Sequence, residues 1–430
     1  MKFPDDHILS AITHPGASWD VLAFIGSLNV GGCEKHLATV YPRLAAVGLK
    51  VGIVTFERGG PLEKELRAGG VDVMCSMRPP RTRILGRDLS RLLGYLWPIT
   101  TVLDISRLLR SGRVGIAHFY LPGAYIFGGL GAVLAGHSNS IMSRRSLNDY
   151  QANHPILSRI ERFLHRRMRL IAANARAVLA QLIAEGAPAD RTFLLYSGVD
   201  LEPLTRVPDR AAARKIFDLT AEQLVIGIVA NLIPYKGHAD LVEALARVSS
   251  RMNLKWVLLV AGRDDGLGRV LKERAESLGI SSSIRWLGSI KDVSTLWRAA
   301  DIGVLASHEE GLPNSLLEAM AMGVPMITTN VGGVADIVTN GLDALVVPPR
   351  NPEAMAEALI ALIESPQLRL RVGEAATARI HDVFSLQKCV DGYRLLYESM
   401  LRQPKLSSAD IARRFQPGSV NLSPTSSAHA

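Results

Sequence analysis

Two glutamates separated by seven residues stand after an apolar run that ends near residue 305. Gly311 and Pro313 predict the start of a helix, whose first N–H groups would attract an anion. We expect Glu310 in the strand-to-helix loop and Glu318 two turns into the helix, both facing a ligand. Carboxylates at this spacing suit the hydroxyls of a sugar or ribose. A glutamate stabilised by the helix dipole, followed by a solvated one, explains the pattern equally well.

A lysine followed by a glycine stands a few residues after a second apolar run, which spans residues 225–230. Lys236 precedes Gly237, and a helix is expected to begin near His238. The ammonium group of such a lysine can lie on a phosphate while the glycine lets the backbone approach closely. The alternative is a loop lysine in solvent.

Further polar residues and glycine pairs follow predicted strands. His118 ends one strand at the edge facing a cleft, with Tyr120 two residues later, although a lone histidine is often a satisfied structural residue. Arg144 and Arg145 follow another strand, where they either meet an acceptor phosphate or are surface charge. Two glycine pairs mark tight strand-to-helix turns: Gly31-Gly32 and Gly332-Gly333.

The elements that position these residues are predicted by apolar runs alternating with amphipathic stretches, which indicate βαβ units and parallel sheets. The chain has 430 residues, 48% of them hydrophobic, enough for two cores. We expect two doubly wound Rossmann-like domains of the α/β class. The expected divisions are residues 1–199, a linker at 200–210, a second domain at 211–384, a helix at 385–401 that packs back on the first domain, and a disordered tail at 402–430.

These segments, together with Gly31-Gly32-Cys33-Glu34, Ser197-Gly198-Val199-Asp200 and Val331-Gly332-Gly333, resemble glycosyltransferase family 4 from about Val21 to Leu401. The resemblance implies a retaining glycosyltransferase of GT-B fold, with two Rossmann-like domains facing across a cleft. Its substrates would be a UDP- or GDP-sugar donor and a saccharide or lipid-linked acceptor, and no nucleic-acid partner is expected.

The resemblance also implies roles for particular residues. Glu310 would contact the transferred sugar and Glu318 the nucleotide ribose. The family's Gly-Arg pair is replaced by Ala230-Asn231, so one cation on the diphosphate is missing, and Arg263 is a candidate substitute. The implied catalytic residues are Lys236, Glu310 and His118. The implied donor-binding residues are Glu318, Gly311, Leu312, Asn231, Arg263, Gly332, Gly333, Gly31 and Gly32. The implied acceptor-binding residues are Tyr120, Arg144 and Arg145.

No metal or cofactor is expected, because no Asp-x-Asp signature ends a predicted strand and the nucleotide-sugar is itself a substrate. Lys236 and the helix start after Gly311 would stabilise the departing diphosphate. The residues leave open whether retention uses a carboxylate nucleophile or same-face attack. Rival functions are a nucleotide-sugar 2-epimerase, a nicotinamide-dependent oxidoreductase, for which Gly129-Leu-Gly131 is a weak fingerprint, and a non-catalytic sugar-nucleotide-binding protein.

Charge is concentrated in residues 78–169, where fifteen arginines face four acidic residues, a net charge of +11, against +9 for the whole chain. Two basic amphipathic helices are expected there, one carrying Arg83, Arg87 and Arg91, the other spanning 154–170. Such helices can lie on anionic lipid or simply cover a core. With three scattered cysteines and no signal peptide, we expect a cytoplasmic protein, peripheral on the inner face of the membrane.

Overall fold

The computed structural model describes residues 8, 17–29, 31–76, 83–84, 87–88, 90–147, 151, 154–249, 255–403 and 406–415; among these, the side chains of 83–84, 87–88, 90–96, 203 and 205 are not described. The chain forms two compact units. Unit 1 comprises Met1–Tyr196 and Cys389–Ala430, and unit 2 comprises Ser197–Lys388. The division therefore falls at Tyr196 and Ser197, and the stretch 200–210 belongs to unit 2.

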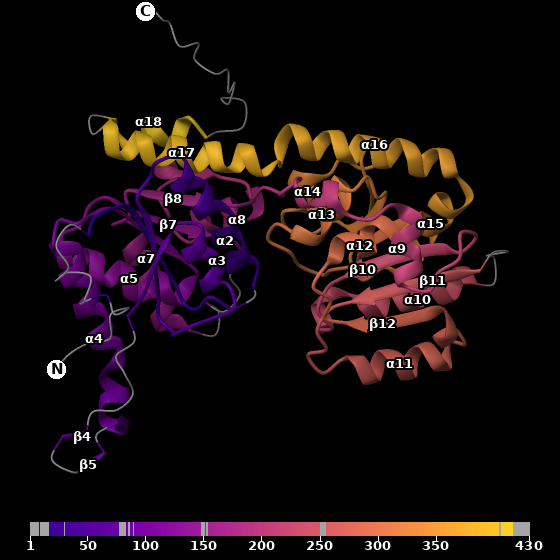
Figure 1. Cartoon of the computed structure of the whole chain (residues 1–430), viewed down its shortest axis with the longest axis horizontal. Coiled ribbons are helices and arrows are strands. Elements are labelled where there is room, and N and C mark those ends of the chain that lie inside the picture. The colour runs from indigo at the N-terminus through magenta and orange to yellow at the C-terminus, as the bar shows by residue number, and fades with distance from the viewer. Residues whose placement is uncertain are drawn as a thin grey trace, which may run out of the picture. The chain divides into compact units, whose positions relative to one another are not determined.

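Unit 1, whose strands β7 and β8 are labelled in Figure 1, is built on seven parallel strands in the order β3-β2-β1-β6-β7-β8-β9. Their bounds are β1 Trp19–Ile25, β2 Val51–Thr55, β3 Asp72–Cys75, β6 Val114–Tyr120, β7 Ser140–Arg144, β8 Leu170–Ala173 and β9 Thr192–Leu194. The helices are α2 Gly32–Ala46, α3 Glu63–Ala68, α4 Ser90–Arg110, α5 Pro122–Ala135, α7 Pro155–His165, α8 Arg176–Ala184, α18 Ser408–Arg413 and all but the first turn of α17 Leu386–Arg402. Strands such as β2 are buried along their whole length, as parallel strands covered on both faces must be.

Unit 2 contains six parallel strands in the order β12-β11-β10-β13-β14-β15. Their bounds are β10 Leu224–Val229, β11 Trp256–Ala261, β12 Ile284–Gly288, β13 Ile302–Leu305, β14 Met326–Thr329 and β15 Leu345–Val347. The helices are α9 Arg210–Ile216, α10 His238–Ser249, α11 Gly268–Ser277, α12 Val293–Ala299, α13 Asn314–Ala321, α14 Val334–Ile337, α15 Pro352–Glu364 and α16 Pro366–Val383. The predicted pair of doubly wound parallel sheets is confirmed.

The chain order of the strands reverses between β10 and β13, which pair directly. In an open α/β sheet, ligands bind outside the carboxyl ends of the strands at such a switch point. The segments that follow β10 and β13 carry Lys236 and Glu310. Topology thus brings together two residues that lie far apart in the sequence.

Two predictions about the ends and edges of unit 1 are wrong. Instead of one helix from residue 83, two short antiparallel strands, β4 Arg83–Ile84 and β5 Arg87–Asp88, precede α4. The tail is ordered over 406–415, because a capping box at Ser407 starts α18 and Phe415 packs on Phe193, with ring centroids 4.9 Å apart. In the described chain, no helix combines the length and apolar character needed to cross a membrane.

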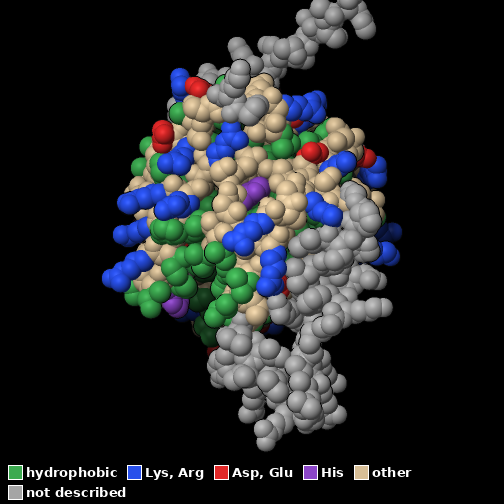
Figure 2. Space-filling model, turned by 90° about the vertical axis from the view of Figure 1, so that its left-hand side faces the viewer, with side chains coloured by type: hydrophobic (Ala, Val, Ile, Leu, Met, Phe, Trp, Pro, Cys, Tyr) green, Lys and Arg blue, Asp and Glu red, His purple; other side chains and the backbone are tan. Residues whose placement is uncertain are grey.

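Helix α7 places its charges and apolar residues unusually. Glu161 and His165 point into unit 1 and are buried, whereas Ile156 and Phe163 are 70% and 43% exposed. Of the two alternatives for this stretch, covering a core does not hold for these two apolar residues, whereas the possibility of contact with lipid stays a prediction. They share the outer surface with Arg159, Arg162, Arg166 and Arg167, and Figure 2 shows Lys and Arg side chains interspersed with hydrophobic ones on this side of unit 1.

A buried network of phenols and imidazoles joins α17 to the first sheet. Tyr397 hydrogen-bonds to the Nδ1 atom of His118 at 2.8 Å and to the hydroxyl of Tyr41 at 3.1 Å. Tyr393 hydrogen-bonds to Nε2 of His36 at 3.1 Å. Burial, with a smaller contribution from the charge of Arg145, holds the pKa values of His36 and His118 well below 6.5.

These two histidines predict a loss of stability in mild acid. The unfolded chain binds protons on them below about pH 6.5, whereas the folded chain does not. Their stabilisation is therefore complete above that pH and falls as pH decreases, by about 1.4 kcal/mol per pH unit for each histidine. Calorimetry between pH 7.5 and 5.5 should show a decreasing Tm. His36→Phe should reduce this decrease, and His381→Gln, at an exposed position, should leave it unchanged. An unaltered pH dependence in His36→Phe would contradict the assignment.

Candidate active site

A lysine and a glutamate meet at the carboxyl end of the second sheet. The Nζ atom of Lys236 lies 2.6 Å from Oε1 of Glu310, with the two side chains 19% and 11% exposed. The hydroxyl of Ser307 donates to the same carboxylate oxygen at 2.7 Å. The site therefore holds a cation and a hydrogen-bonded carboxylate in direct contact, still reachable from solvent.

Two glycines allow the surrounding loops to approach this pair. Gly332 has a φ of +48°, and a Cβ atom there would lie 1.7 Å from the carbonyl oxygen of Glu310. Gly237 has a φ of +67°, and a Cβ atom there would lie 1.9 Å from the carbonyl oxygen of Ala306. Both conformations favour glycine, so larger residues would separate the loops. The structure thus brings together three segments predicted separately.

Arg263, the predicted substitute for the missing phosphate-binding cation, follows β11, the strand that pairs with β10. The backbone N–H of Arg263 donates to Oδ1 of Asn231 at 3.2 Å, so the two residues are neighbours. The guanidinium group is exposed and pairs with Asp265 at 2.6 Å. A phosphate role for Arg263 would therefore require an exchange of partners, and it stays a prediction.

Helix α13 begins later than its sequence suggests. Its first residue is Asn314, and no side chain caps its amino end, which leaves first-turn N–H groups directed away from the helix. Glu318 is the fifth residue of α13, so it lies little more than one turn from the start and not two. Gly311 is part-buried and Leu312 is buried in the preceding loop. None of these positions conflicts with a donor site, and their roles stay predictions.

The glycine pair of unit 1 opens α2. Gly31 is the N-cap, without a side-chain cap, and Gly32 is the first helical residue. The carboxylate of Glu34 folds over this turn, so that a Cβ atom on Gly31 would lie 2.3 Å from its Oε2. Burial raises the pKa of Glu34. A diphosphate at this turn would meet an acidic group, whereas a sugar hydroxyl could donate to it.

The expected placement of His118 at a strand end is wrong. Strand β6 continues to Tyr120, and the His118 side chain is 0% exposed. Its Nε2 contacts the hydroxyl of Ser143 at 2.7 Å, and Tyr120, also buried, reaches its Nδ1 at 3.2 Å. Both ring nitrogens of His118 are thus occupied inside unit 1, which favours the structural alternative for this histidine, and the acceptor role of the buried Tyr120 stays a prediction.

Arg144 is also placed differently from its prediction. It is buried, and its guanidinium group contacts Glu185 at 2.6 Å and Glu161 at 3.2 Å. An acceptor phosphate would have to displace these carboxylates. Arg144 and Arg145 together line a cavity of about 70 Å³ with Tyr125 and Ser143 at the carboxyl ends of β6 and β7.

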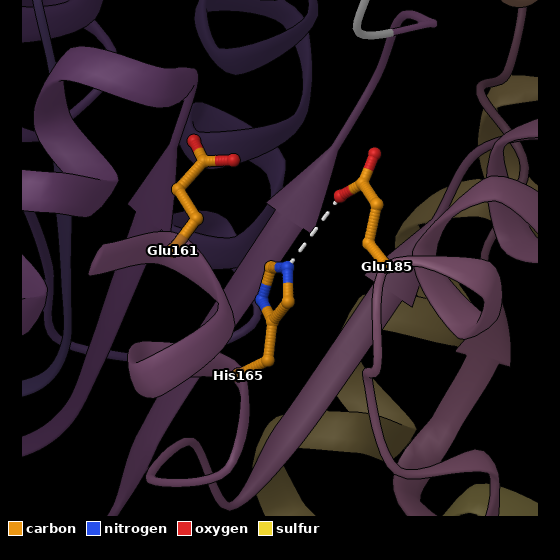
Figure 3. Close-up of side chains that lie close together, drawn as sticks. All are labelled: Glu161, His165 and Glu185. Carbon is orange, nitrogen blue, oxygen red and sulfur yellow. Dashed lines mark ion pairs between the residues drawn. The ribbon is translucent and has the colours of Figure 1, made fainter. Parts of the chain in front are cut away.

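The carboxylates around Arg144 form a cluster that the sequence analysis missed. Nε2 of His165 lies 3.6 Å from Glu185 (Figure 3). Nδ1 of the same ring lies 2.9 Å from the hydroxyl of Tyr125. Glu161, His165 and Glu185 are close enough to ligate one metal ion. However, the carboxylate oxygens that would bind it already accept hydrogen bonds from Arg144. Glu161 and His165 stand at i and i+4, a spacing that can be recognised in the sequence. The many arginines around them indicated a basic surface helix instead of a buried cluster.

Two family models match successive parts of the chain. The model described as "Glycosyltransferase Family 4" matches residues 30–203, and "Glycosyl transferases group 1" matches residues 209–379. The D-inositol 3-phosphate glycosyltransferase of Corynebacterium urealyticum is 27% identical over 423 residues, covering 92% of this chain and 96% of that protein.

Solved structures share the fold. A glycosyltransferase from Rickettsia africae matches with a TM-score of 0.72 and 20% identity, covering 89% of this chain and 98% of that one. Anabaena HepE, solved with UDP, matches with a TM-score of 0.75 and 19% identity, covering 88% and 99%. The fold is therefore GT-B. Since the two family models together account for most of the chain, the protein belongs to glycosyltransferase family 4.

Proposed function

We propose that this glycosyltransferase takes a sugar from a UDP- or GDP-sugar bound by unit 2 and transfers it, with retention and without a metal, to a saccharide acceptor carried on a lipid. The observation that carries the donor half is the contact of Lys236 with Glu310 at the switch point of the second sheet. The complexes of Anabaena HepE with UDP and with UDP-glucose support a nucleotide-sugar as the donor.

Transfer requires the bond between the anomeric carbon and the phosphate oxygen to break. Negative charge then develops on the diphosphate, where the Lys236 ammonium and the uncapped start of α13 would stabilise it. Glu310 would separate from Lys236 and accept a hydrogen bond from a hydroxyl of the sugar. Glu318 would accept a hydrogen bond from a hydroxyl of the ribose. With a hydroxyl of the sugar and the hydroxyl of Ser307 both donating to it, the Glu310 carboxylate would be a weak nucleophile. This favours attack by the acceptor oxygen on the face being vacated, its proton passing to the leaving phosphate oxygen.

The acceptor half rests on unit 1. The cavity lined by Ser143, Arg145 and Glu161 offers hydroxyl, guanidinium and carboxylate groups, which suit a saccharide. On the outer side of the same helix that contributes Glu161, the surface of α7 combines exposed arginines with exposed Ile156 and Phe163. Such a surface suits reversible contact with the anionic inner face of the cytoplasmic membrane.

Lys236→Ala should lower turnover by about 2–4 kcal/mol in barrier, because it removes charge stabilisation directed at the leaving diphosphate. The donor is first identified by thermal stabilisation with UDP-glucose, GDP-mannose and related nucleotide-sugars, and turnover is then measured at saturating donor. Lys272→Ala, an exposed lysine on α11, is the matched control. Near-normal turnover of folded Lys236→Ala would overturn the phosphate role.

Chelation should leave activity intact, because the charge on the leaving group is assigned to Lys236 and the start of α13. Turnover is compared before and after EDTA treatment, and again after adding magnesium or manganese. Complete loss in EDTA that either metal restores would refute metal independence.

The protein should sediment with anionic vesicles but not with neutral ones, and high salt should release it. Changing Arg159, Arg162 and Arg166 to Gln should weaken the binding by about 1 kcal/mol per residue. The matched control replaces Arg269, Lys272 and Arg371, exposed cations of unit 2, with Gln and should bind normally. If the protein stays in the supernatant with both vesicle types at low salt, the acceptor is not reached through this surface.

A further inference from the structure

A histidine–aspartate pair lies beside the Lys236–Glu310 contact and has no part in the function proposed above. Nε2 of His308 lies 2.7 Å from Oδ2 of Asp240, and the side chains are 17% and 18% exposed. His308 stands in the loop between β13 and α13, two residues before Glu310. Asp240 lies in the first turn of α10, four residues after Lys236, where the helix dipole favours a negative charge.

His308 holds the lysine segment at two points. Its backbone N–H donates to the carbonyl oxygen of Tyr235 at 2.7 Å, one residue before Lys236. Its side chain contacts Asp240 at the other end of the same six-residue segment. Between these points, the close approach of Gly237 to Ala306 keeps the segment against the second loop.

The Lys236–Glu310 ion pair cannot serve as this connection during the reaction. A donor that places its diphosphate on the lysine and its sugar on the glutamate must separate the two groups. Once the ion pair opens, the contacts made by His308 are those that still hold the two loops at their resting distance.

We propose that His308 and Asp240 form a positioning pair that keeps the loops of Lys236 and Glu310 in register while the donor separates those two residues. The inference rests on the donor site proposed above. Neither residue of the pair touches the reacting atoms. Their contribution is alignment, and a displacement of about 1 Å in an active site can cost about 100-fold in rate.

The test measures kcat and KM for water-supported hydrolysis of UDP-glucose, or of GDP-mannose if that nucleotide-sugar stabilises the protein. His308→Phe keeps the ring volume but removes the hydrogen bond, and Asp240→Ala removes the acceptor. Each should lower kcat by about 10- to 100-fold with a smaller change in KM. His308→Gln, which retains an N–H donor, should stay within about threefold of the wild type. The double variant should be no worse than either single variant.

Glu243→Gln is the matched control, because Glu243 lies one turn further along α10 and pairs with Arg274 of α11, away from the site. It should leave kcat unchanged. A normal kcat in His308→Phe, equal impairment of His308→Gln and His308→Phe, or additive losses in the double variant would overturn the positioning role.

Lys236→Ala and Glu310→Gln are measured in the same assay. If both keep normal turnover, the proposed donor site is wrong. If both lose turnover while His308→Phe and Asp240→Ala keep it, the positioning pair alone is wrong.

Discussion

The donor site proposed for this protein centres on an ion pair that a bound donor would have to separate. Lys236 and Glu310 satisfy each other at 2.6 Å in a partly solvated position, where such a pair contributes little net stability. In the function proposed above, a diphosphate and a sugar would replace these partners. The resting contact thus holds both side chains in place until a donor binds.

The parallel sheet explains why these two residues meet. Adjacent strands β10 and β13 end at the same edge, and the strand order reverses between them. Gly237 and Gly332 then let the following loops lie against β13 and Glu310. Substituting either glycine would strain a positive-φ position and displace a loop, so the chemistry depends on backbone geometry as well as on charge.

The sequence predicted most of the fold and the segments that meet at the candidate donor site, because both follow local rules. Apolar runs, turn glycines and the Glu310–Glu318 spacing can be recognised in the sequence without knowledge of which residues contact one another in the fold. The predictions that misplaced residues of unit 1 concern side chains whose positions are determined by tertiary contacts. His118 is held by Tyr397, 279 residues away, and Arg144 by Glu185, 41 residues away. No pattern near either residue reveals these partners, so an arginine paired inside the protein and one available to a ligand look alike in the sequence.

Helix α7 carries both the buried partners of Arg144 and the exposed surface on which the proposed membrane contact rests. Its inner face gives Glu161 and His165 to the cluster around Arg144, so this helix is fixed by buried charge pairing in place of a fully apolar stripe. Its apolar residues Ile156 and Phe163 lie on the opposite, solvent-exposed face among exposed arginines. Burying charge is costly unless it is paired, and the pairing with Arg144 offsets that cost. The pairing of Arg144 inside unit 1 thus accompanies the exposed basic and apolar surface of α7, on which the proposed contact with a lipid-linked acceptor rests.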